Sequence, residues 1–177
     1  MQQSAALSVQ AARSGDELAF AALLQAALEP GYRLACALLH DPQAAEDAVQ
    51  EAAFKAWLKI ARLREGAELR PWFLGIVANE CRNTRRSGWW SRVTSLVADR
   101  TIESHPDSVL TGVEVRRALR ALDHGHRLVL VLRWYLDLPV EEIARATGLS
   151  VHAVESRLTR ATRELRKRLQ AMEIGNG

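Results

Sequence analysis

Between residues 139 and 169, the apolar positions recur at the spacing of two amphipathic helices separated by a tight turn. Pro139 suits a first helical position, Gly148 suits the residue just past a helix C-terminus, and Ser150 is a favourable N-cap. One face of the first helix consists of Val140, Ile143, Ala144 and Thr147, and the apolar side of the second consists of Val151, Val154, Leu158, Ala161 and Leu165. The pattern predicts a helix-turn-helix.

The second of these helices is strongly basic. It carries Arg157, Arg160, Arg163, Arg166, Lys167 and Arg168 against Glu155 and Glu164. An ordinary helical hairpin with a solvated face is the alternative interpretation. The basic excess and the polar side chains in the first turns favour a helix that lies in a DNA major groove and reaches base edges.

The N-terminal part of the chain also has helical periodicity. Ser14 and Glu17 have capping-box spacing and predict a helix that ends near Pro30, followed by a short buried helix over 32–39. Asp41 followed by Pro42 predicts the start of a third helix, over 43–63.

The third helix carries a polar stripe beside an aromatic residue. The stripe consists of Asp47, Gln50 and Glu51, with Phe54 at its boundary. Acidic residues near a helix start complement the helix dipole, which is a sufficient structural reason for them. A docking face for a basic partner explains them equally well, and the residues alone leave both interpretations open.

Pro71 opens a fourth helix, over 71–87, after a polar loop that runs from Arg64 to Arg70. The first half of this helix is apolar, whereas the second half carries Asn79, Arg82, Asn83, Arg85 and Arg86. A core helix with a solvated C-terminal end accounts for the pattern. Contact with an unstacked nucleic-acid strand is the functional alternative.

Helical periodicity fades from residue 87 to 106, around the pair Trp89–Trp90, and resumes in helices over 107–122 and 124–136. Asp123 is the predicted N-cap of the second of these helices. The chain therefore divides into two all-helical modules, 10–88 and 107–170, with a flexible linker over 89–106.

Composition narrows the possible functions. The chain has 177 residues, 48% of them hydrophobic and 25% charged, a net charge of +3 and a pI of about 9.2, which suits a phosphate-bearing partner if the charge is clustered. Cys36 and Cys81 lack metal-ligand spacing and are expected to be buried thiols.

No signal peptide and no apolar run of the ~20 residues that span a bilayer is present, so a cytoplasmic location is expected. We expect no metal, no cofactor, no small-molecule substrate and no catalytic residue, because no nucleophile–base pair or ligand cluster is recognisable.

Three motifs in this order resemble the bacterial extracytoplasmic-function (ECF) RNA polymerase sigma factors. They are AEDAVQEAAFKAW at 45–57, RPWFLGIVANECRNTRR at 70–86 and EEIARATGLSVHAVESRLTRATRELRKRL at 141–169. The resemblance implies an all-α protein with a sigma region 2 bundle over 10–88 and a sigma region 4 helix-turn-helix over 107–170.

The resemblance also implies site residues and partners. Binding of core RNA polymerase, through its β′ clamp helices, falls on Asp47, Gln50, Glu51 and Phe54, and the β flap is a second expected contact. Binding of the promoter −10 element falls on Arg64, Asn79, Arg82, Asn83, Arg85 and Arg86. Binding of the −35 element falls on His152, Glu155, Ser156, Arg157, Thr159 and Arg160. An anti-sigma factor is a further expected partner.

Two departures from the family pattern occur in the last helix. His152–Ala153 replaces a common Gly-Thr, and Glu155 replaces a common Lys or Arg. A carboxylate repels phosphate but accepts a hydrogen bond from cytosine N4. DNA binding is therefore still expected, but the usual −35 preference is not. The competing hypothesis is a stand-alone helix-turn-helix regulator that binds a palindromic site as a dimer.

Overall fold

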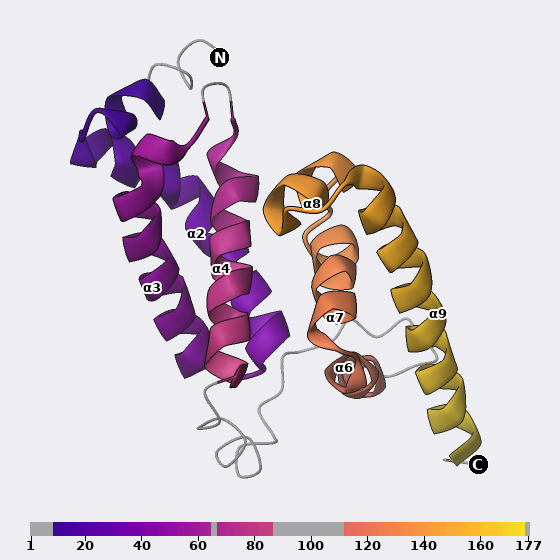
Figure 1. Ribbon diagram of the computed structural model, residues 1–177. Coiled ribbons are helices and arrows are strands. Elements are labelled where there is room, and N and C mark those ends of the chain that lie inside the picture. Colours follow the sequence, from indigo (N-terminus) through magenta and orange to yellow (C-terminus); the bar gives the residue numbers. More distant parts are fainter. Residues whose placement is uncertain (1–8, 65–66, 87–111, 176–177) are drawn as a thin grey trace.

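The computed structural model describes residues 9–64, 67–86 and 112–175, and every regular element among these residues is a helix. The helices form two groups, coloured indigo to magenta and orange to yellow in Figure 1. The expected all-α fold with two helical domains is confirmed. Among the described helices, none has both the length and the apolar content that crossing a membrane requires.

In the described part of the first domain, α2 (Glu17–Leu39), α3 (Pro42–Lys59) and α4 (Leu69–Arg86) pack pairwise on one another, after a short helical segment over 9–13. A 3-10 turn, Ile60–Arg62, extends α3. The apolar stripes meet in one core, where the rings of Phe20 and Trp57 lie 5.1 Å apart between centroids. Complete burial of a large apolar side chain stabilises the fold by about 1.5–3 kcal/mol, and the side chains buried here include Leu34, Leu38, Phe73, Leu74 and Val77.

Helix α2 differs from the prediction. The expected break at Pro30 is wrong, because one continuous helix runs through it from Glu17 to Leu39. Proline removes one backbone hydrogen bond, but the turns on both sides of it bury apolar residues, among them Leu24, Leu34 and Leu38. Tertiary packing therefore outweighs the local helix-breaking tendency.

The predicted N-cap of α2 is also wrong. Asp16 caps the helix, with its Oδ1 accepting a hydrogen bond from the backbone N–H of Ala19 at 3.0 Å. The Ser14 hydroxyl instead donates to the carbonyl of Gln10 at 3.1 Å. The cap predicted for α3 is confirmed, since Asp41 Oδ1 accepts from the N–H of Ala44 at 2.9 Å.

Over residues 112–175, the second domain consists of four helices and a π-helical turn. They are α6 (Gly112–Ala121), α7 (His124–Leu130), the π turn η2 (Val131–Tyr135), α8 (Val140–Thr147) and α9 (Val151–Gly175). Asp123 caps α7 as expected, accepting from the N–H of His126 at 3.0 Å. Residues 107–111, where the sequence predicts the start of α6, lie outside the described residues.

The predicted helix-turn-helix is present in α8 and α9. Gly148 adopts φ 70°, the left-handed conformation that favours glycine. The Ser150 hydroxyl accepts the N–H of Ala153 at 3.2 Å. Two details differ from the prediction: Pro139 is the N-cap of α8 rather than its first helical residue, and Val151, placed on the core face by its spacing, is 41% exposed.

The two domains pack against each other, chiefly where α8 crosses α4 (Figure 1). The predicted linker over 89–106, with Trp89 and Trp90, lies outside the described residues.

Candidate functional site

The polar stripe of α3 forms a continuous exposed face. Its residues recur at helical spacing, and all four are exposed: Asp47, Gln50, Glu51 and Phe54. Phe54 is 59% exposed, and Leu58, one turn further along, is 62% exposed. An acidic stripe with two accessible apolar side chains is suited to a partner that presents both basic and apolar groups.

One lysine connects this stripe to the neighbouring helix. Lys55 Nζ lies 3.0 Å from Glu51 Oε1 on the same helix and 2.7 Å from Glu80 Oε2 on α4. The hydrogen bonds to Glu80 and Glu51 raise the pKa of Lys55. Glu51 is therefore partly neutralised within the chain, whereas Asp47 has no ion pair of this kind among the described residues.

The second half of α4 presents its predicted polar residues to solvent. Asn79, Arg82, Asn83 and Arg85 are all exposed, and Arg82 Nη2 donates to Asn79 Oδ1 at 3.0 Å. Arg64 is exposed as well, near the start of α4. The Arg86 side chain lies outside the described residues. The surface offers guanidinium and amide groups, which bind phosphate and base edges.

The α9 residues predicted to contact DNA fall into two groups. His152, Glu155, Thr159 and Arg160 are exposed, whereas Ser156 and Arg157 are half-buried. The Arg160 side chain lies along its own helix, with Nε donating to the Ser156 carbonyl at 3.2 Å. Val151, which its spacing places on the core face, is exposed at the start of the same helix.

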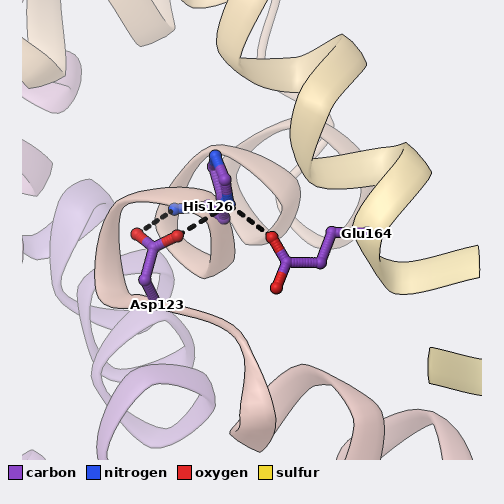
Figure 2. A group of neighbouring side chains, drawn as sticks. All are labelled: Asp123, His126 and Glu164. Carbon is purple, nitrogen blue, oxygen red and sulfur yellow. Dashed lines mark hydrogen bonds and ion pairs between the residues drawn. The ribbon is translucent and has the colours of Figure 1, made fainter. Parts of the chain in front are cut away.

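Three ligand-type side chains meet where α7 packs on α9 (Figure 2). His126 Nδ1 lies 2.6 Å from Asp123 Oδ2 and 3.2 Å from Glu164 Oε2. Glu164 also pairs with Arg168, whose hydrogen bond lowers the Glu164 pKa. We interpret the cluster as a network of polar contacts that orients α9 on α7, because its carboxylates are already engaged with the cap, the histidine and an arginine.

The cysteines behave largely as predicted. Cys81 is buried and Cys36 is half-buried, and both thiols are free. Burial raises the pKa of Cys81 to about 12 and also raises the pKa of Cys36. Both side chains are therefore poor nucleophiles at neutral pH.

Comparison with known proteins agrees with the two-domain division. Residues 23–91 match the family described as sigma-70 region 2, and residues 112–165 match sigma-70, region 4. The chain is 30% identical over 171 residues to the ECF RNA polymerase sigma factor SigL of Mycobacterium tuberculosis, covering 91% of this chain and 97% of SigL. It is 30% identical over 146 residues to the RNA polymerase sigma factor SigV of Bacillus subtilis, covering 81% and 86% of the two chains.

A further relative is longer than this chain. The match to the probable sigma factor RfaY of Xanthomonas campestris, at 30% identity over 168 residues, spans 89% of this chain but 42% of RfaY. Among solved structures, the sigma factor RpoE of Bartonella quintana, in complex with the anti-sigma factor NepR, is 26% identical with a TM-score of 0.63. That match covers 83% of this chain and 94% of RpoE.

Both halves of the chain match sigma regions in the order that the sequence motifs predict, and two relatives are matched over most of their length. The chain therefore belongs to the sigma-70 family, in its extracytoplasmic-function group, and is a sigma factor of transcription initiation.

Proposed function

We propose that this sigma factor docks on core RNA polymerase through the α3 stripe. It then reads the −10 element with α4 and the −35 element with α9. The domain division in this proposal is 10–88 for region 2 and 107–170 for region 4. The observation that carries it is the separation of charge, with a carboxylate-bearing stripe on α3 and basic polar faces on α4 and α9.

Docking falls to Asp47, Gln50, Glu51 and Phe54. Phe54 is the apolar anchor, and its 59% exposure makes it available to a partner without rearrangement. Asp47 and Glu51 surround it with negative charge, which steers a basic partner surface into register. The β′ clamp helices are the polymerase element implied by the family resemblance, and the β flap is the expected second contact, on region 4.

Reading of the −10 element falls to Arg64 and to the exposed α4 residues Asn79, Arg82, Asn83 and Arg85, with Arg86 as the last member of the basic run. Displacing a base from a duplex costs a few kcal/mol, and stacking on an aromatic side chain returns about 1–3 kcal/mol per base. The half-buried Trp72 near the start of α4 is available for such stacking. This near balance makes melting depend on attachment to polymerase.

Reading of the −35 element falls to the polar face of α9, with His152, Glu155, Thr159 and Arg160 toward base edges and Ser156 and Arg157 beside them. A duplex major groove admits one helix, and residues in its first turns contact bases. Glu155 is suited to accept from cytosine N4. The exposed Val151 adds an apolar contact for a thymine methyl group.

An anti-sigma factor is a further proposed partner, as NepR is for RpoE. A protein that works on core polymerase also belongs in the cytoplasm. The reaction chemistry then resides in the polymerase, and no catalytic residue, metal or cofactor is assigned to this chain.

The proposal is tested by transcription in vitro with core polymerase and by co-elution with it in gel filtration. Replacement of Asp47 and Glu51 by Lys reverses the charge of the docking stripe and should abolish co-elution and transcript formation while helical content is retained. The matched control replaces Glu17 and Glu29 of α2 by Lys, which gives the same change of net charge outside α3. Undiminished co-elution of the α3 variant would contradict the docking assignment.

A further inference from the structure

We propose that the second half of α9 binds the phosphate backbone beside the −35 element through Arg163, Arg166 and Lys167, and that it supplies affinity without base preference. These three residues are called the basic end of α9. The inference rests on the proposed function, which assigns −35 reading to α9 but extends no further along the helix than Arg160.

The basic end lies on the same face of α9 as the residues proposed to read bases. The helix runs from Val151 to Gly175 along the outer edge of the second domain (Figure 1). Its opposite side packs on the core, where Val154 and Ala161 are fully buried. The exposed residues recur at the helical spacing of about 3.6 residues and so share one face. They are His152, Glu155, Thr159, Arg160, Arg163, Arg166 and Lys167.

The positive charge of the basic end is not neutralised within the described chain. Glu164 is the only carboxylate between residues 161 and 167. One of its oxygens is engaged by Arg168, and the other lies 3.2 Å from His126 Nδ1. Within the part of the chain that the structure describes, no residue of the basic end forms an ion pair. Three exposed cations are therefore available to a partner within about 6 Å of helix length.

The length of α9 places the basic end outside the groove that its first half enters. The reading residues from His152 to Arg160 span about 12 Å of the helix axis, which matches the width of the major groove. Lys167 lies about 10 Å further along the axis. Because the groove winds around the duplex and the helix is straight, this part of α9 meets the phosphates that border the groove.

The side chains of the basic end are suited to phosphate rather than to a pattern of bases. Arginine and lysine offer only hydrogen-bond donors, and the arginine guanidinium binds a phosphate through two of them. The phosphate backbone presents the same acceptors at every base pair, so contacts to it fix the position of a protein but carry no sequence information. Such contacts make affinity steeply dependent on salt, because each one releases bound counterions.

The first half of α9 gives the helix a reason to need this contribution. Glu155 is exposed among the reading residues, and its carboxylate repels phosphate. The three cations of the basic end offset that repulsion at a distance from the bases. Arg166 and Lys167 also follow the segment 112–165 that matches sigma-70, region 4, so their role does not come from that comparison.

The test measures binding of promoter DNA by holoenzyme, formed from the full chain and core polymerase, as a function of salt. The promoter is one identified by mapping transcription start sites with the same holoenzyme. The double variant Arg163→Gln and Arg166→Gln removes two cations, and addition of Lys167→Gln removes the third. Glutamine is a good helix former, so α9 should remain folded, which circular dichroism checks.

Each phosphate contact contributes about 0.9 to the slope of log Kd against log salt concentration. The slope should therefore fall by about 2 in the double variant and by about 3 in the triple variant, and Kd near 0.1 M salt should rise by about 10- to 100-fold. The matched control is the double variant Arg117→Gln and Arg120→Gln, which removes two exposed arginines from α6. It should leave both the slope and Kd close to those of the parent.

Base preference is the second readout. The ratio of Kd between the parent promoter and promoters with single −35 changes should stay within about twofold in the variants of the basic end. A folded variant with the parent's salt dependence would overturn the phosphate contact. A changed −35 preference would overturn the sequence-independent role. A parent holoenzyme that selects no promoter would contradict the proposed function, and the salt dependence of the free chain on an unrelated duplex would then decide the phosphate contact separately.

Discussion

Arg160 lies on the exposed face of α9, and its guanidinium rests on the helix through the hydrogen bond to the Ser156 carbonyl. That bond lies within one turn of the helix and is accessible to water, so its net contribution is small and the side chain is free to swing toward a base edge. Arginine that donates two hydrogen bonds to guanine is a frequent specific contact in the major groove. Arg160 is therefore the most direct residue-scale test of −35 reading.

Arg160→Ala should cost about 1–3 kcal/mol of promoter discrimination at one −35 position. The measurement is transcription in vitro from promoters that vary singly in the −35 element. Arg117→Ala removes the same charge from an exposed site on α6 and should leave the base preference unchanged. An Arg160 variant with the parent's −35 preference would remove this residue from the set that reads bases.

At the scale of elements, the sequence predicted helix positions best where a cap coincided with an apolar stripe. Asp41, Asp123 and Ser150 were each predicted as caps, and each accepts the expected backbone N–H. Ser14 satisfied the same rule but does not cap α2, because its hydroxyl donates to the Gln10 carbonyl and Asp16 takes the cap position. The capping-box pattern does not register this competing hydrogen bond.

The contact between the two domains could not be predicted from the sequence, because it also depends on more than local sequence patterns. Gly75 reads as an ordinary residue of an apolar helix, and Arg127 as one more surface arginine. Their roles arise from segments far away in the chain: α8 crosses at Gly75, and the Leu38 carbonyl meets Arg127. Hydrophobic periodicity reports which face of a helix is buried but not which partner covers it. For the candidate site, periodicity placed the α3 stripe on the exposed face, whereas the half-burial of Ser156 and Arg157 required the tertiary structure.

The start of α2 offers a stability test of this distinction. Asp16→Ala removes the acceptor for the Ala19 N–H and should lower the free energy of unfolding by about 0.5–2 kcal/mol. Ser14→Ala, the change expected to matter from the sequence pattern, should alter it by less than about 0.5 kcal/mol, as surface changes usually do. Urea unfolding followed by circular dichroism measures both. An equal decrease in the free energy of unfolding for both variants would mean that Ser14 stabilises the start of α2 as much as Asp16 does.

At the scale of the whole molecule, acidic and basic side chains lie on different faces, which the net charge does not reveal. A net charge of +3 conceals an acidic stripe on α3 and basic faces on α4 and α9. Arginines also gather where the domains meet, so that Arg85, Arg120 and Arg127 all act on the same neighbouring histidine, His40. The positive charge of these arginines therefore repels any additional positive charge at the interface.

Two histidines at this boundary make acid a specific stress on the folded chain. Burial, with repulsion from Arg127, Arg120 and Arg85, lowers the pKa of His40 from 6.5 to about 3. Burial, with repulsion from Arg85, Arg127 and Arg82, lowers the pKa of His124 to about 4 against an opposing pull from Asp123. Below pH 6.5 the unfolded chain therefore binds protons that the folded chain refuses, so the free energy of unfolding decreases as the pH falls.

We expect the contribution of these histidines to be present above pH 6.5 and to decline as the pH falls from 6.5 to about 4 for His124 and to about 3 for His40. From pH 7 to pH 5 the loss should be about 1–2 kcal/mol for His40 and less for the more accessible His124. The measurement is urea unfolding as a function of pH. The double variant His40→Asn and His124→Gln should show a flatter dependence; asparagine is chosen because residue 40 has φ 59°. Replacement of the exposed His152 by Gln is the control. A double variant that kept the parent's pH dependence would place the acid sensitivity elsewhere, because these two side chains would then bind protons equally well in the folded and unfolded chains.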